Sequence, residues 1–123
     1  SVGIVRFLMA IEQPTPAITA AVDGAVGWLK SVAISGLRYE DVTLGDGTRD
    51  RRVVADPSAP PLWARFYELG TNRPIFTGRD KVIRYALTEI EQERRSGYAY
   101  YGTWPAALLA TDYPRWRARL ERF

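Results

Sequence analysis

Apolar residues recur at three- and four-residue steps through the first quarter of the chain, a spacing that predicts two helices. The first helix is expected over residues 2–11, and Pro14 ends it. The second is expected over Pro16–Val32, because Thr15 is a good N-cap and proline is favoured at the first helical position. Trp28 lies on the flank of this helix, where core packing is favoured over a role as a ligand platform.

The next segment favours strands. Residues Ile34–Leu44 alternate weakly between apolar and polar, and Arg51–Ala55 turns apolar again. The glycine-rich turn Gly45–Thr48 separates these runs, so we expect a β-hairpin. Asp46 and Asp50 invite comparison with a calcium-binding loop. The sequence lacks the further ligands and the closing Glu of that pattern, which favours a solvated turn.

Arginines interleave with aromatic side chains from Trp63 to Pro105. Inside this stretch the sequence predicts turns at Gly70–Pro74 and Thr77–Asp80. A helix is expected to begin at Thr88, through a capping box with Glu91, and to stop near Gly97.

This interleaving indicates a binding chemistry. A guanidinium group binds carboxylate or phosphate bidentately and also stacks on flat faces, so the mixture suits an anionic polymer that contains rings. A nucleic acid and an acidic polysaccharide both meet that description. The net charge of +3 is small for a dedicated DNA-binding domain, which usually carries a stronger basic stripe.

Composition sets further limits. A chain of 123 residues with 46% hydrophobic residues is expected to fold as one globular domain. The sequence has no run of 18 apolar residues, so no membrane span is expected. It contains neither cysteine nor histidine, which excludes disulfides, Cys nucleophiles and Ser-His-Asp triads within the chain. Proton transfer would have to use Asp, Glu, Lys, Tyr or an unusually placed Arg.

The order of residues from Trp63 to Pro105, W-A-R-F-Y-E-L-G-T-N-R-P-I-F-T-G-R-D and then A-L-T-E-I-E-Q-E-R-R-S-G-Y-A-Y-Y-G-T-W-P, resembles the C-terminal part of the pectate lyases of polysaccharide lyase family 10. A looser match extends upstream through V-R-F-L-M and A-V-G-W-L-K. The fold that this resemblance implies is mainly α, part of an (α/α) toroid of paired helices with a small β-hairpin. The N-terminal half of the toroid is expected to be absent, so residues 1–123 would be the C-terminal portion of a single catalytic domain.

The resemblance assigns substrate-binding roles to individual residues. It implies that Arg65 in W-A-R-F-Y-E and Arg79 in G-R-D bind uronate carboxylates. Arg73 is a weaker candidate, and Tyr67, Tyr98 and Tyr101 are candidates for lining a sugar cleft, with core packing equally open for each.

Simpler roles compete with these assignments. Surface ion pairing with Glu68 is the alternative for Arg65, and pairing with Asp80 is the alternative for Arg79. Arg94 and Arg95 follow three glutamates on the predicted helix, so ion pairing along that helix is the favoured interpretation.

The activity that the resemblance implies is cleavage of polygalacturonate by anti β-elimination, with calcium as cofactor and an arginine as base. The calcium ligands and the base are expected to lie outside this chain: neither Arg6 nor Arg38 stands in the motif of the base, so the catalytic residue stays unknown. The chain alone is therefore expected to be inactive, with the upstream part of the same protein as its partner. Secretion or a periplasmic location is expected. The alternative is a non-catalytic binding module for acidic polysaccharide or nucleic acid.

Overall fold

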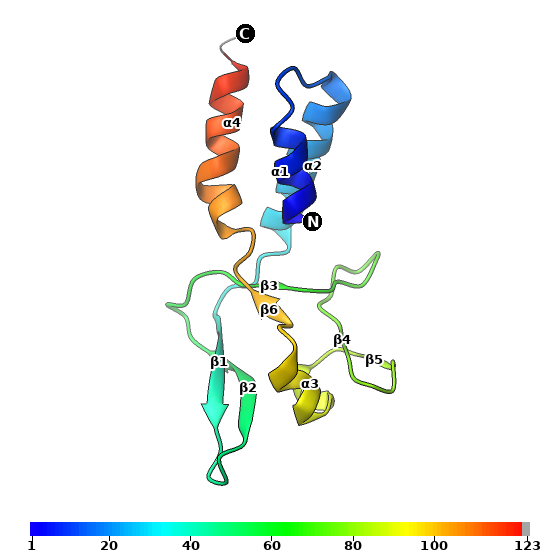
Figure 1. Cartoon of the computed structure of the whole chain (residues 1–123), viewed down its shortest axis with the longest axis vertical. Coiled ribbons are helices and arrows are strands. Elements are labelled where there is room, and N and C mark those ends of the chain that lie inside the picture. Colours follow the sequence, from blue (N-terminus) through cyan, green and yellow to red (C-terminus); the bar gives the residue numbers. More distant parts are fainter. Residues whose placement is uncertain (122–123) are drawn as a thin grey trace. The chain divides into compact units, whose positions relative to one another are not determined.

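The computed structural model describes residues 1–121, which form two compact units. Unit 1 comprises Ser1–Ala33 together with the chain from Trp104 onward, and unit 2 comprises Ile34–Thr103. Figure 1 labels their helices and strands.

Unit 1 is helical. In α2, Thr15 Oγ1 accepts a hydrogen bond from the Ile18 backbone N–H at 3.2 Å and Pro16 occupies the first turn, as the sequence predicts. Val22 and Val26 are buried at the spacing of one helical turn. The helices of unit 1 are α1 (Val2–Met9), α2 (Pro16–Ser31), the π-helical turn η2 (Leu108–Asp112) and α4 (Tyr113–Leu120).

Polar contacts tie the two ends of the chain together inside unit 1. Arg6 on α1 pairs with Asp112 at 2.8 Å, and the Tyr113 hydroxyl donates to Asp23 on α2 at 2.7 Å.

Trp28 is 36% exposed, so the prediction that it belongs to the core is wrong.

Unit 2 contains short antiparallel strand pairs. The predicted hairpin is confirmed: β1 and β2 pair from Leu37↔Ala55 to Thr43↔Arg49, and Gly47 in the turn has a φ of 84°. The other pairs are β3 with β6 and β4 with β5, each strand being two residues long. Its strands and helices are β1 (Leu37–Thr43), β2 (Arg49–Ala55), β3 (Trp63–Ala64), β4 (Phe76–Thr77), β5 (Ile83–Arg84), the 3₁₀ turn η1 (Leu87–Glu89), α3 (Gln92–Gly97) and β6 (Tyr101–Gly102).

A small apolar cluster forms the core of unit 2. Phe76, Leu87, Ile90 and Tyr100 are buried together, with Tyr39, Val53, Tyr98 and Tyr101 packed against them. The Tyr100 hydroxyl donates to the Thr77 carbonyl at 2.6 Å, so this buried phenol keeps a polar partner.

The prediction of a mainly α chain that forms part of an (α/α) toroid is wrong. The described chain is 40% helix and 21% strand, with small antiparallel sheets. The difference lies in unit 2, where prolines and glycines interrupt the chain too often for long helices: Gly70 has a φ of 87°, which ends regular structure in the Gly70–Pro74 turn.

The predicted helix after Thr88 also differs. Residues 87–89 form the 3₁₀ turn η1, and α3 begins only at Gln92, with no side-chain cap on its first turn. The expected capping role of Glu91 is lost because its carboxylate instead accepts the Arg79 backbone N–H at 2.6 Å. The predicted end at Gly97 is confirmed.

Candidate functional site

Arg65 follows β3 and is held by the segment that follows α3. Its backbone N–H donates to the Tyr100 carbonyl at 2.8 Å, and its side-chain Nε donates to the Ala99 carbonyl at 2.8 Å. The guanidinium carbon lies 4.9 Å from the centre of the Tyr98 ring. Arg65 is exposed, so its charge faces solvent while its stem and Nε are tied to unit 2.

The Tyr98 ring gathers further side chains. The Phe66 ring is parallel to it, with centroids 6.1 Å apart and an interplanar angle of 2°. Arg94 on α3 places its guanidinium carbon 5.4 Å from the ring centre, and its Nε is buried without a hydrogen-bond partner among the described residues. Two cations therefore meet one aromatic ring.

Arg79 is held differently. Its guanidinium pairs with the Glu93 carboxylate on α3, with 66% of the arginine and 63% of the glutamate side chain exposed. The pairing lowers the pKa of Glu93. Asp80 is paired with Arg84 at 2.9 Å. The buried Gly78 lets the chain pass close to Glu91, because a Cβ at that position would collide with the Glu91 carboxylate.

Arg73 lies in the turn between Glu68 and Pro74. Its guanidinium carbon is 3.8 Å from the Tyr85 ring centre. The Glu68 carboxylate accepts the Thr71 hydroxyl at 2.6 Å and also the Tyr85 hydroxyl, and these two hydrogen bonds lower the pKa of Glu68. The cluster thus fixes Arg73 against a ring that glutamate holds in place.

Tyr67 and Tyr101 lie deeper in unit 2 than the arginines. The Tyr67 hydroxyl accepts the Ala64 backbone N–H at 2.9 Å, and burial raises its pKa. Tyr101 on β6 packs at 5.4 Å from Tyr39 and 5.5 Å from Phe76, and burial raises its pKa to about 12. Both side chains have packing roles inside unit 2, which leaves their predicted role in a sugar cleft untested.

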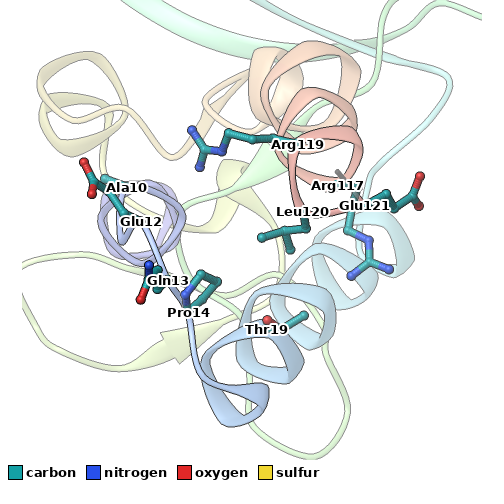
Figure 2. A pocket seen from close by; sticks show the side chains of 9 residues that line it. All are labelled: Ala10, Glu12, Gln13, Pro14, Thr19, Arg117, Arg119, Leu120 and Glu121. Atoms are coloured by element: carbon teal, nitrogen blue, oxygen red, sulfur yellow. The ribbon is translucent and has the colours of Figure 1, made fainter. Parts of the chain in front are cut away.

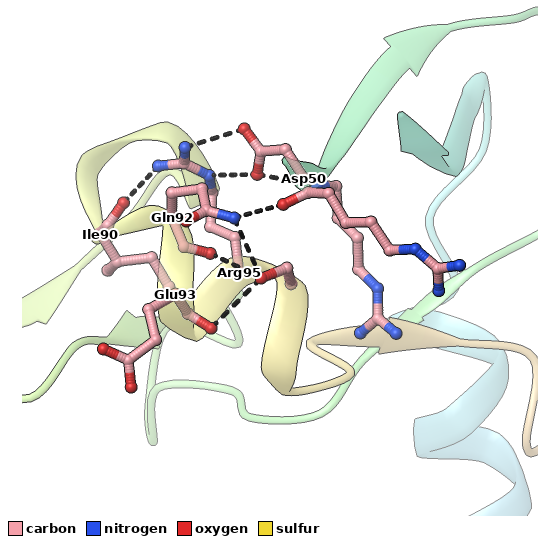
Figure 3. A network of polar contacts seen from close by, with 8 residues as sticks. Asp50, Ile90, Gln92, Glu93 and Arg95 are labelled. Atoms are coloured by element: carbon pink, nitrogen blue, oxygen red, sulfur yellow. Dashed lines mark hydrogen bonds and ion pairs between the residues drawn. The ribbon is translucent and has the colours of Figure 1, made fainter. Parts of the chain in front are cut away.

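The prediction that Arg95 pairs along its own helix is wrong. Arg95 reaches from α3 to Asp50 on β2, with Nε and a terminal nitrogen each 3.0 Å from a carboxylate oxygen (Figure 3). Both side chains are 18% exposed, and Arg95 also donates to the Ile90 carbonyl. Gln92 adds a hydrogen bond to the Arg49 carbonyl. This network fixes α3, which carries Glu93 and Arg94, against the hairpin.

The described residues do not fit a calcium site. No group of three or more Asp or Glu among residues 1–121 is arranged to hold a metal ion. Asp46 accepts the Thr48 backbone N–H at 2.9 Å, which agrees with the predicted solvated turn, and Asp50 is committed to Arg95.

Arg38 is also a poor base. It pairs with Glu40 at 3.1 Å and Asp56 at 2.9 Å, and these carboxylates raise its pKa. Arg6 is paired with Asp112.

Unit 1 has a groove of its own, with a volume of 860 Å³. It lies between the α1–α2 connection, the start of α2 and the end of α4 (Figure 2), and its lining includes Glu12, Gln13, Thr19, Arg117 and Arg119. None of the predicted substrate-binding residues lines it. Arg119 donates to the Met9 carbonyl at 2.9 Å and Arg117 pairs with Asp23 at 3.4 Å, so contacts within the unit account for both arginines.

Comparison with known proteins identifies the chain. The model of the pectic acid lyase family matches residues 1–109, so the chain belongs to this family. The resemblance inferred from the sequence motifs is therefore confirmed. A search of curated proteins gave no match. Among residues 1–121, no helix is long and apolar enough to cross a bilayer.

Two solved structures of the family 10 polysaccharide lyase from Cellvibrio cellulosa are similar to the chain. One, a mutant in complex with trigalacturonic acid, shares 32% sequence identity over 94% of this chain, with a TM-score of 0.74. The other shares 30% identity over 97% of this chain, with a TM-score of 0.76. The chain spans about a third of those proteins, 34% and 35% of their lengths.

Proposed function

We propose that the protein containing this chain is a pectate lyase that cleaves polygalacturonate by anti β-elimination, and that Arg65 and Arg79 bind uronate carboxylates. The observation that carries the proposal is the family match over residues 1–109. The relative solved with trigalacturonic acid supports the choice of substrate, because it is 32% identical over nearly the whole of this chain.

The chemistry assigns these arginines a defined task. In β-elimination a base removes the C5 proton of a uronate, whose neighbouring carboxylate must carry the developing negative charge. Cationic groups fixed in advance around that carboxylate stabilise the charge without reorganising. Arg65 suits this task because its Nε bond to Ala99 and its contact with Tyr98 hold the guanidinium at the surface of unit 2.

Arg79 would have to share or exchange its present partner. The Glu93 carboxylate is paired with the guanidinium of Arg79, the group that a uronate carboxylate would bind. Exposed ion pairs contribute only about 0–1 kcal/mol, so a substrate carboxylate can replace Glu93 at small cost.

The resemblance also implies calcium, which would supply positive charge at the same carboxylate. Among residues 1–121 no group of carboxylates fits the cation, so its ligands are proposed to lie elsewhere in the protein. The chain alone is proposed to lack lyase activity, because no residue in it is assigned as base or calcium ligand. A secreted or periplasmic location fits an enzyme that acts on an extracellular polymer.

The test is a lyase assay. The full-length protein, incubated with polygalacturonate with and without calcium, should produce unsaturated oligosaccharides that absorb in the ultraviolet, while the purified 123-residue chain should not. Binding of trigalacturonic acid and of a DNA oligonucleotide at physiological salt should be measured in parallel. Absence of unsaturated products from the full-length protein, or tighter binding of DNA, would overturn the proposal.

A further inference from the structure

Tyr98 connects an exposed candidate arginine to the core of unit 2. It is the residue directly after α3, and its backbone N–H caps that helix by donating to the Arg94 carbonyl at 3.1 Å. The backbone there is extended, with φ −141° and ψ 132°. On one side of this connection lies the guanidinium of Arg65, 4.9 Å from the ring centre. On the other lies Tyr100, only 1% exposed, in edge contact at 5.0 Å.

The Tyr98 ring is itself fixed. Phe66, the neighbour of Arg65 in sequence, stacks parallel to it, and Tyr100 meets it at 62°. Rings packed in this way contribute stabilisation beyond the area that they bury. A side chain held by two rings, one of them in the core, has little freedom to move.

A fixed ring restricts the guanidinium beside it. Arginine has many rotamers, and an exposed arginine loses that freedom when it binds a carboxylate bidentately. At Arg65 the Nε bond to Ala99 and the flat face of Tyr98 already restrict the plane of the guanidinium. The side chain of Arg65 therefore loses its rotamer freedom when the chain folds, and not when the substrate binds. This favours tighter binding.

We propose that Tyr98 is a positioning residue: its ring holds Arg65 in the orientation in which that arginine binds a uronate carboxylate. The inference rests on the function proposed for Arg65. The phenol hydroxyl has no part in it, because the contacts to Arg65, Phe66 and Tyr100 are made by the ring.

The experiment measures kcat and KM of the full-length enzyme on polygalacturonate for Tyr98→Phe, Tyr98→Leu and Arg65→Ala, and for Tyr98→Leu combined with Arg65→Ala. Loss of the ring should raise KM roughly three- to tenfold, the range of a cation–π contact expressed as affinity. The value of kcat should fall as well, because Arg65 is also proposed to stabilise the charge that develops on that carboxylate, so kcat/KM should fall by more than the rise in KM alone. Tyr98→Phe keeps the ring and should keep the KM of the parent enzyme.

The combined variant decides whether Tyr98 acts through Arg65. In the Arg65→Ala background, Tyr98→Leu should leave KM unchanged within about twofold, because residues that act through one contact are not additive. An equal rise in KM in both backgrounds would overturn the inference, as would no effect of Tyr98→Leu on its own. If Arg65→Ala leaves KM unchanged, the function proposed for Arg65 fails instead.

Loss of folding must be separated from loss of positioning. Tyr113→Leu is the matched control, because it removes another ring beside a cation, 5.7 Å from Lys30 in unit 1. It should lower the melting temperature without raising KM. Tyr98→Met, which retains bulk but lacks a ring, is the second variant should Tyr98→Leu fold poorly. A Tyr98→Met enzyme with normal KM would refute the proposal.

Discussion

Unit 1 is built from helices whose buried residues recur at helical spacing. Unit 2 is built from one hairpin, several two-residue strands and turns, and polar side chains hold these pieces together. Val22, Val26 and Leu29 of α2 are buried at helical spacing. In unit 2, Arg95 joins α3 to β2, Glu91 accepts the backbone N–H of Arg79, and Ala99 accepts from Arg65.

The difference shows where a binding site can be placed. In a regular helix the backbone N–H and C=O groups hydrogen-bond to each other. The apolar side chains of α2 then form the core. Turns and short strands expose backbone carbonyls, and the Ala99 carbonyl is used to orient an arginine. Functional side chains commonly lie on such connecting segments, positioned by a rigid scaffold. All the predicted substrate-binding residues belong to unit 2.

The largest effect is expected from emptying either core. Phe76→Ala in unit 2 should lower the free energy of unfolding by about 3–5 kcal/mol, and Leu108→Ala in unit 1 by about 2–5 kcal/mol, because each side chain is almost completely buried and leaves a cavity. Urea unfolding measures both. Only Phe76→Ala should also weaken binding of trigalacturonic acid under native conditions. An equal loss of binding in both variants would contradict the separation of roles.

The next effect concerns the arginines themselves. Arg65→Lys and Arg79→Lys keep the charge but remove the planar fork, so kcat/KM on polygalacturonate should fall roughly ten- to a hundredfold, about 1.5–3 kcal/mol.

Arg52→Lys is the control for these two variants, since Arg52 pairs with Glu40 on the hairpin and is largely exposed. Arg94 is unsuitable as a control because its guanidinium meets the Tyr98 ring and its Nε is buried. If Arg65→Lys and Arg79→Lys behave like Arg52→Lys, the assignment of both arginines is wrong.

The sequence predicts the first two helices of unit 1 and the hairpin of unit 2 well, and the rest of unit 2 less completely. Helical periodicity, the Thr15 cap and Pro16 are local signals, and α1, α2 and the hairpin β1–β2 follow them. The capping box at Thr88 is a local signal too, but it is overruled because Glu91 finds a partner at Arg79, twelve residues earlier. A contact across that separation leaves no periodic pattern.

The candidate site shows the same limit. Motif resemblance identifies Arg65 and Arg79 but not the residues that hold them. Glu93, one of the glutamates predicted to pair along its own helix, binds Arg79 instead, and Tyr98, a candidate for a sugar cleft or for the core, lies against the guanidinium of Arg65. The glutamates before Arg94 suggested pairing along the helix, whereas Arg95 crosses to Asp50. A signal for these partners would be correlated substitution between Asp50 and Arg95.

A smaller effect tests the tie between hairpin and helix. Arg95→Gln should lower the free energy of unfolding by about 1–2 kcal/mol at pH 7, because it leaves a half-buried Asp50 without its cation. Pairing lowers the pKa of Asp50, so the stabilisation is complete above about pH 4 and is lost as pH falls through the lowered pKa. The difference between parent and variant should therefore shrink toward pH 3. Urea unfolding at both pH values checks this, and a constant difference would contradict it. Arg51→Gln, whose partner Asp41 is exposed, should change stability less.

The smallest effect expected is confined to unit 1. Thr15→Ala removes the acceptor for the Ile18 N–H at the start of α2 and should lower the free energy of unfolding by about 1 kcal/mol. Thr15→Ser retains a hydroxyl and should cost less than Thr15→Ala. Neither change should alter binding of trigalacturonic acid, because Thr15 belongs to unit 1 and the predicted site to unit 2. Thermal unfolding and calorimetric titration of the same samples give both quantities. A Thr15→Ala variant that loses affinity as well as stability would show that the helical unit does more than support the fold, and would contradict the assignment of substrate binding to unit 2 alone.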